Sequence, residues 1–148
     1  MRLLRFLAAL ILVAMGWLTL TYWPEFPAPP PELAGRTTLG RGKGMLLLLP
    51  LLGLATYGML ALAARFSDQF GVVVPITPEN ARRQRSLVRV LAARLQFQTA
   101  LLYAVIQWKL ISTSILGKEG LGVALIPVLL MVLVGTIAIY LIQSYRAR

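Results

Sequence analysis

Residues 121–142 read LGVALIPVLLMVLVGTIAIYLI and contain no charged side chain. An apolar run of about 18 residues or more is long enough for a helix to cross the hydrocarbon core of a bilayer, which is roughly 30 Å thick. Pro127 lies near the start of the run, where a helix tolerates proline best. Tyr140, Tyr145 and Arg146 stand at its end, as the interfacial anchors of a membrane helix do. The stretch predicts a transmembrane helix and so decides the fold class.

Two further apolar runs lie nearer the amino terminus, at residues 6–22 and 45–64. Arg2 and Arg5 precede the first run, and Arg65 closes the second. A cleaved signal peptide is the alternative interpretation of the first run, because it shares a basic start and an apolar stretch with a membrane helix. The length of the run, with no A-x-A cleavage site after it, favours a retained helix. We expect both runs to span the membrane.

The composition also indicates a membrane protein. Of 148 residues, 58% are hydrophobic and 14% are charged, and the mean hydropathy is +0.76. The chain has no cysteine and no histidine, which removes thiolate sites, the commonest metal ligand and His-ligated haem. We therefore expect no metal and no cofactor. The net charge of +10 would suggest nucleic acid in a soluble protein, but these cations lie mainly between apolar runs, so anionic lipid is the expected partner.

A long helix is predicted over residues 77–116. Thr77 suits its N-cap and Pro78 its first helical position. Such a helix would be roughly 58 Å long at 1.5 Å per residue, which exceeds the thickness of a bilayer. We therefore expect residues 96–116 to cross as the third of four spans. Residues 65–95 are then a cytoplasmic loop and a basic helix start.

Loops and charges predict the topology. Residues 23–44 are rich in proline and glycine, cannot sustain a helix, and are expected to form an outer loop. With both ends and the segment between the second and third spans inside, the inner side holds 10 of the 15 Lys and Arg residues. The positive-inside rule therefore favours two cytoplasmic termini. The prediction is one all-α domain over residues 1–148, an integral membrane four-helix bundle whose third helix extends into the cytoplasm.

Five polar side chains of the third span share one helical face, falling within about 80° of one another at 100° per residue. Unpaired polar groups are costly in hydrocarbon, so this face should meet other helices, a ligand or a water-filled groove. One interpretation is a binding groove for a polar lipid, a quinone or a peptide segment. The other, which we favour, is hydrogen bonding between helices. The five residues are Gln96, Thr99, Tyr103, Gln107 and Ser114.

A basic face comes before this polar one on the same helix. Arg82, Arg85 and Arg89 lie within about 60° of one another, with Leu87 and Leu91 on the opposite side. The functional interpretation is capture of anionic lipid headgroups or of an acidic partner. The alternative is that the arginines only fix the orientation of the chain.

Catalytic templates are absent from the sequence. There is no Gly-x-Ser-x-Gly motif, no P-loop and no cluster with metal-ligand spacing, and we predict that the protein is not an enzyme. Lys109 lies near the outer end of the third span and is expected to snorkel to the interface beside Trp108. The acidic residues form no close pair in the sequence: Glu25, Glu32, Asp68, Glu79 and Glu119.

The order of several short elements resembles that of a bacterial membrane family, domain of unknown function 1648, which also forms the amino-terminal part of SdpI-type immunity proteins. The family usually has a histidine in a Pro-x-His-Phe pattern of the outer loop, where this chain has residues 27–30, Pro-Ala-Pro-Pro. The resemblance implies a helical protein of the bacterial inner membrane and suggests immunity or signalling. The elements are Trp23-Pro24-Glu25-Phe26-Pro27, residues 40–43 before Leu47-Leu48-Leu49-Pro50, Pro75-Ile76-Thr77-Pro78-Glu79-Asn80-Ala81, and residues 103–108.

A short apolar chain without catalytic residues is typical of an accessory subunit. We therefore expect a noncatalytic membrane protein, an accessory or structural subunit of a larger membrane complex, which contacts partner helices and lipid. The alternative is a stand-alone immunity or signalling protein resembling the SdpI group.

Overall fold

The computed structural model describes residues 2–25, 43–66, 77–115 and 122–146, and these residues form four α-helices and no strand. The all-α prediction is confirmed, and each helix matches a predicted one to within a few residues at most ends. The predicted outer loop and the loop before the basic helix start lie largely outside the described residues. The helices are α1 (Arg2–Tyr22), α2 (Lys43–Arg65), α3 (Ala81–Ser114) and α4 (Gly122–Arg146).

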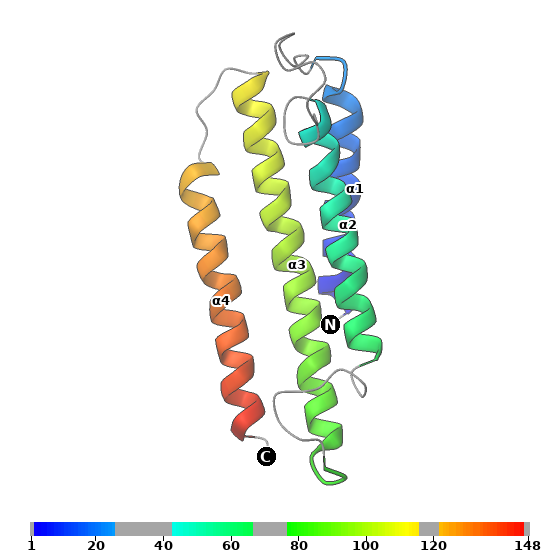
Figure 1. Ribbon diagram of the computed structural model, residues 1–148, viewed down its shortest axis with the longest axis vertical. Coiled ribbons are helices and arrows are strands. Elements are labelled where there is room, and N and C mark those ends of the chain that lie inside the picture. The colour runs from blue at the N-terminus through cyan, green and yellow to red at the C-terminus, as the bar shows by residue number, and fades with distance from the viewer. Residues whose placement is uncertain (1, 26–42, 67–76, 116–121, 147–148) are drawn as a thin grey trace.

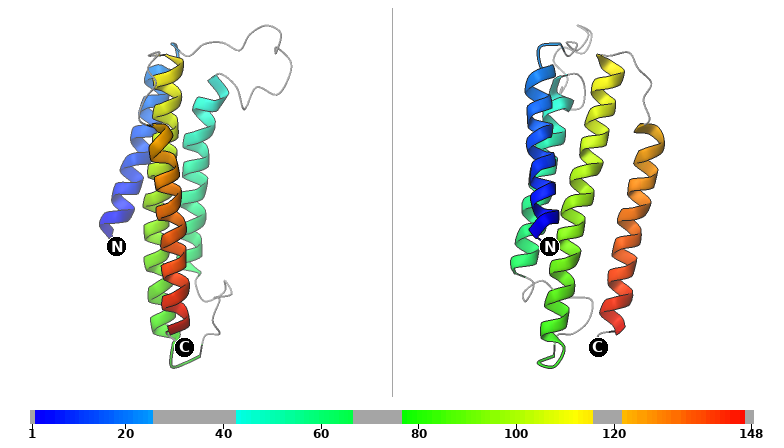
Figure 2. Two further views of the ribbon diagram at one scale, coloured as in Figure 1. Left: turned by 90° about the vertical axis from the view of Figure 1, so that its left-hand side faces the viewer. Right: turned by 180° about the vertical axis from the view of Figure 1, so that it is seen from behind.

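Packing is centred on α3 (Figure 1). The helices run alternately up and down along one long axis, with α1 and α2 on one side of α3 and α4 on the other (Figure 2). The longest helix, α3, contacts all three others, whereas α1 and α2 make few contacts with each other and α4 packs on α3. The carboxyl end of α4 lies near the start of α3, whereas α1 begins part of the way along α3 (Figure 1). The arrangement is more open than the predicted four-helix bundle.

Three of the described helices are long and apolar enough to cross a membrane, as in a multi-pass membrane protein. They are α1, α2 from Leu46 and α4 from Ala124, with mean hydropathies of 2.2, 2.1 and 2.7. The central helix α3 is not in this class, although it was predicted to contain the third span. Its most apolar part carries Gln98, Gln107 and Lys109, which lower its hydropathy. Its central position explains this composition, because neighbouring helices cover part of its surface.

The start of α3 differs from the prediction. The helix begins at Ala81 with Asn80 at its N-cap, three residues after the predicted N-cap Thr77. Thr77 nevertheless holds the preceding turn, since its carbonyl oxygen accepts from the Ala81 N–H at 3.0 Å. The Thr77 N–H donates to Asn80 Oδ1 at 2.9 Å, and Asn80 N–H donates to Thr77 Oγ1 at 3.4 Å. This reciprocal pair resembles a capping box with asparagine in place of glutamate.

Small side chains line the helix contacts. Ala92, Ala93 and Ala100 of α3 are buried, and small residues let helix backbones approach closely in a membrane protein. Leu12 of α1 packs closely on Gly53 of α2, because a Cβ atom at Gly53 would lie 2.8 Å from Leu12 Cδ2. The described residues thus form a thin core along α3 and leave most of α4 exposed.

Candidate functional site

Gln107 joins α3 to α1. Its Nε2 donates to the Met15 carbonyl oxygen at 3.1 Å and to Thr19 Oγ1 at 2.8 Å. The Thr19 hydroxyl lies 2.9 Å from the Met15 carbonyl oxygen and 3.3 Å from that of Leu46 in α2, so its proton has two alternative acceptors. All three side chains of Met15, Thr19 and Gln107 are buried. This network links three helices.

Gln96 and Tyr103 join α3 to α2. Gln96 Nε2 donates to the Tyr57 carbonyl oxygen at 3.1 Å, and the Tyr103 hydroxyl lies 3.5 Å from Thr56 Oγ1. The other two residues of the predicted stripe behave differently. Thr99 donates to the carbonyl oxygen of Leu95 in its own helix at 2.7 Å. Ser114 is exposed at the end of α3.

A second polar face of α3, which the sequence analysis missed, contacts α4. Gln84 Nε2 donates to the Ser144 carbonyl oxygen at 3.0 Å, and Ser144 Oγ donates back to Gln84 Oε1 at 3.0 Å. Gln98 Nε2 donates to Thr136 Oγ1 at 2.8 Å. Gln84 and Gln98 are 14 residues apart and so share a helical face to within about 40°. The spacing of Gln84 and Gln98 in the sequence could have predicted this second polar face.

Three of these glutamines use only the amide nitrogen. The Oε1 atoms of Gln96, Gln98 and Gln107 are buried without a hydrogen-bond partner among the described residues. A buried acceptor without a partner costs about 1–3 kcal/mol. Gln84 differs, because both ends of its amide are bonded. The polar side chains of α3 therefore hold helices together, at an energetic cost at three positions.

The basic face lies at the other end of α3 from Ser114. Arg82, Arg85 and Arg89 are exposed and, together with Pro78 and Ser86, line a surface groove of about 670 Å³. The structure thus brings the three predicted arginines together. On the opposite side of α3, Leu87 and Leu91 line a small cavity with Thr136 and Tyr140 of α4. Capture of an anionic group by the arginines stays a prediction.

The lysine and the acidic residues considered in the sequence analysis lie at or near the surface where the structure describes them. Lys109 is half-buried beside Trp108, whose side chain is 50% exposed, as a lysine near the interface would be. Glu25 and Glu79 are exposed, and the other three acidic residues lie outside the described part of the chain. Within that part, no group of three or more His, Cys, Asp or Glu residues is placed to hold a metal.

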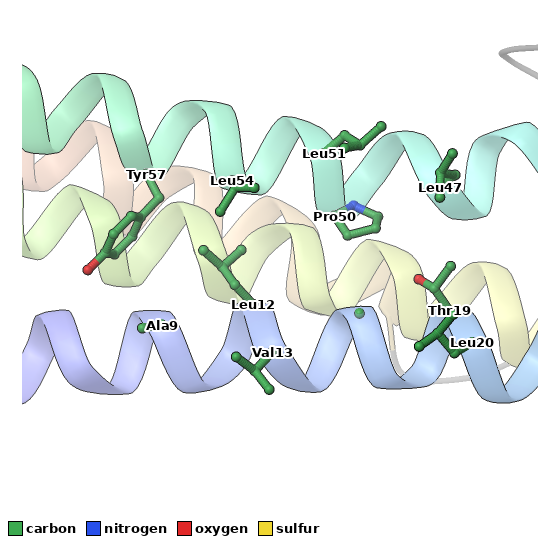
Figure 3. A pocket seen from close by; sticks show the side chains of 11 residues that line it. Ala9, Leu12, Val13, Thr19, Leu20, Leu47, Pro50, Leu51, Leu54 and Tyr57 are labelled. Carbon is green, nitrogen blue, oxygen red and sulfur yellow. The ribbon is translucent and has the colours of Figure 1, made fainter.

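An apolar groove runs between α1 and α2 (Figure 3). Its volume is about 510 Å³, and Tyr57 lies at one end of it, with Thr19 and Leu20 at the other. Gly16 widens it, since a Cβ atom at this position would meet nothing within 4 Å. The sequence does not predict this groove, because its lining comes from two helices whose packing against each other no single segment encodes. The remaining lining residues are Ala9, Leu12, Val13, Leu47, Pro50, Leu51 and Leu54.

Comparison of the chain with protein-family models, curated proteins and solved structures finds no match.

Proposed function

We propose that the protein is a noncatalytic integral membrane protein that serves as an accessory or structural subunit of a larger membrane complex. The observation that carries the proposal is the use of the polar residues of α3. Four buried or half-buried glutamines each donate to a neighbouring helix. These side chains are occupied in joining helices, which is the role of polar residues in many membrane helix interfaces.

The proposed topology has four crossings with both termini in the cytoplasm of a bacterial inner membrane. Three apolar helices support three of them. The fourth is α3, which packs alongside all three and so shares their layer. Its 34 residues measure roughly 51 Å at 1.5 Å per residue, so about 20 Å project beyond a hydrocarbon core of about 30 Å. We place that projection, with Arg82, Arg85 and Arg89, on the cytoplasmic side, against anionic lipid headgroups.

The proposed contact for a partner is the outer face of α4. Only 6% of the most apolar window of α4 is buried, against 17% in both α1 and α2. Met131 is 68% exposed and Val134 is 63% exposed on this helix. An apolar transmembrane helix of another subunit is the occupant that this composition favours. It would give α4 the second protein neighbour that α1 and α2 each already have.

Site-specific photo-crosslinking in intact membranes tests the proposal. A photoreactive amino acid at Met131 should give one discrete protein adduct, identified by mass spectrometry. The same residue at Met59 of α2, which is 71% exposed, is the matched control and should give only lipid adducts. Lipid adducts alone at Met131, together with a monomer in mild detergent, would remove the subunit proposal.

The alternative, an immunity or signalling protein resembling the SdpI group, rests on the sequence resemblance alone. It predicts a toxin or repressor gene beside this one. Deletion of the gene should then increase sensitivity to a membrane-active peptide, and unchanged sensitivity would remove this alternative.

A further inference from the structure

We propose that the groove between α1 and α2 binds one acyl chain of an anionic glycerophospholipid, whose phosphate is held by Arg5. This inference rests on membrane insertion of α1 and α2 and is independent of any partner on α4. It also concerns a part of the molecule remote in sequence from the basic face of α3.

The lining of the groove suits hydrocarbon. All of its side chains are apolar except the Thr19 hydroxyl and the Tyr57 hydroxyl. Thr19 already donates to backbone carbonyl oxygens, and the Tyr57 hydroxyl lies 3.5 Å from the Arg5 carbonyl oxygen. The interior therefore offers few polar contacts to a sugar, a nucleotide or a peptide backbone. An aliphatic chain needs none.

The dimensions favour one chain over a helix. The groove extends along α1 from Ala9 to Leu20, which is roughly 16 Å at 1.5 Å per residue. A volume of about 510 Å³ over that length corresponds to a mean cross-section of roughly 30 Å². A helix with side chains is about 10 Å wide and has a cross-section of roughly 80 Å². A partner helix would therefore rest on the rim, whereas an acyl chain fits inside.

Arg5 supplies the charge at one end. It precedes Ala9 by four residues and so lies on the same face of α1, one turn beyond the groove. It is half-buried, and its Nε atom is buried without a hydrogen-bond partner among the described residues. A guanidinium binds a phosphate through charge-assisted hydrogen bonds, which are about twice as strong as neutral ones. The hydrogen bond from the Tyr57 hydroxyl to the Arg5 carbonyl oxygen places the Arg5 backbone beside the Tyr57 end of the groove.

Two substitutions test the binding of the acyl chain and the binding of the headgroup independently. Gly16→Leu introduces a bulky side chain into the lining of the groove, at a position where nothing lies within 4 Å of the added Cβ atom. Gly58→Leu is the matched control, since its Cβ atom is equally unobstructed and it does not line the groove. Arg5→Gln removes the proposed phosphate contact, and Arg2→Gln, at an exposed cation on the same helix, is its control.

The measurement is native mass spectrometry of the full chain from nanodiscs that contain equal amounts of phosphatidylglycerol and phosphatidylcholine. The wild type, Gly58→Leu and Arg2→Gln should each retain one phosphatidylglycerol. Gly16→Leu should lose this retention for both lipids. Arg5→Gln should keep a bound lipid but lose the preference for phosphatidylglycerol by about fivefold, the effect of one cation near a membrane surface.

A second measurement does not depend on the variants. Phosphatidylglycerol with a photoreactive group near the end of one acyl chain should label wild-type peptides that contain Leu20 or Leu47, at the end of the groove away from Arg5, in preference to peptides of α4. Equal labelling of all exposed helices, or equal retention in Gly16→Leu and Gly58→Leu, would overturn the proposal. So would a protein adduct in place of lipid at this groove.

Discussion

Gln84 and Gln96 of α3 differ in how completely their side chains are bonded. Both ends of the Gln84 amide are paired with Ser144, whereas Gln96 donates to Tyr57 and leaves Oε1 buried without a partner among the described residues. Hydrogen bonds between membrane helices average about 0.6 kcal/mol. A buried acceptor without a partner costs about 1–3 kcal/mol. At Gln96 the penalty for the buried Oε1 atom therefore exceeds the stabilisation from its one hydrogen bond. At Gln84 there is no such penalty, because Oε1 accepts from Ser144.

This balance predicts opposite outcomes for one substitution at the two positions. Gln84→Met should destabilise the protein by about 1–2 kcal/mol, because two bonds are lost and Ser144 loses its acceptor. Gln96→Met should be neutral or stabilising, since it removes a single bond together with the buried Oε1 atom. The measurement is reversible unfolding in mixed micelles, followed by circular dichroism. Equal destabilisation at both positions would contradict the argument.

A steric prediction applies to Gly53. A Cβ atom there would lie 2.8 Å from Leu12 Cδ2 and 3.6 Å from Tyr103 Cδ2. Gly53→Val should cost about 1–3 kcal/mol through overpacking. The double variant Gly53→Val with Leu12→Ala should recover part of this loss, because it removes the nearest obstructing atom. Gly58→Val is the control and should behave like the wild type in the same unfolding measurement, since nothing lies within 4 Å of its Cβ position.

The hydrogen bonds of the polar residues of α3 show which features of the site the sequence could predict and which it could not. The helical period indicated that Gln96, Tyr103 and Gln107 share a face, and the structure places all three toward α1 or α2. It could not identify their partners, because a partner such as Met15 lies 92 residues away and contributes only a backbone oxygen. The face with Gln84 was missed because its members are far apart along the helix.

At the scale of the element, α3 depends on its neighbours more than the other helices do. The apolar runs of α1, α2 and α4 made them predictable from the sequence, and their bounds in the structure confirm this. By contrast, α3 was predicted from its capping residues and its length. Its residues alone are not apolar enough for α3 to be counted among the candidate membrane spans. Its place in the fold therefore comes from packing and hydrogen bonds that no single segment encodes.

Insertion of isolated segments tests this dependence. Residues 122–146, placed in a host protein with a glycosylation reporter, should insert almost completely, because their hydropathy is high and no charge interrupts them before Arg146. Residues 96–115 should insert poorly in the same host, since Gln96, Gln98 and Lys109 oppose partitioning. Efficient insertion of the α3 segment alone would show that neighbouring helices are not required.

At the scale of the whole molecule, the alternation of the four helices places the start of α3 near the end of α4, and α1 begins in the same half of the molecule (Figure 1). Arg82, Arg85 and Arg89 belong to that end of the molecule. Arg5 lies further along the molecule, because Tyr57 contacts both Arg5 and Gln96, near the middle of α3. A bilayer around α1, α2 and α4 would therefore have its more basic side there. The proposed topology has this side in the cytoplasm, as the positive-inside rule favours.

Single cysteines test this orientation directly, because the chain has none of its own. Glu25→Cys, after the far end of α1, should react with a membrane-impermeant maleimide added to intact cells. Arg83→Cys, at an exposed position near the start of α3, should react only after the membrane is permeabilised. The reverse pattern would invert the molecule and place the basic face of α3 outside. Reaction of both positions in intact cells would mean that α3 does not cross as a fourth span. In that event the glutamines of α3 would lie against neighbouring helices at the membrane surface, and the apolar groove between α1 and α2 would be the part of the proposed function that still faces lipid.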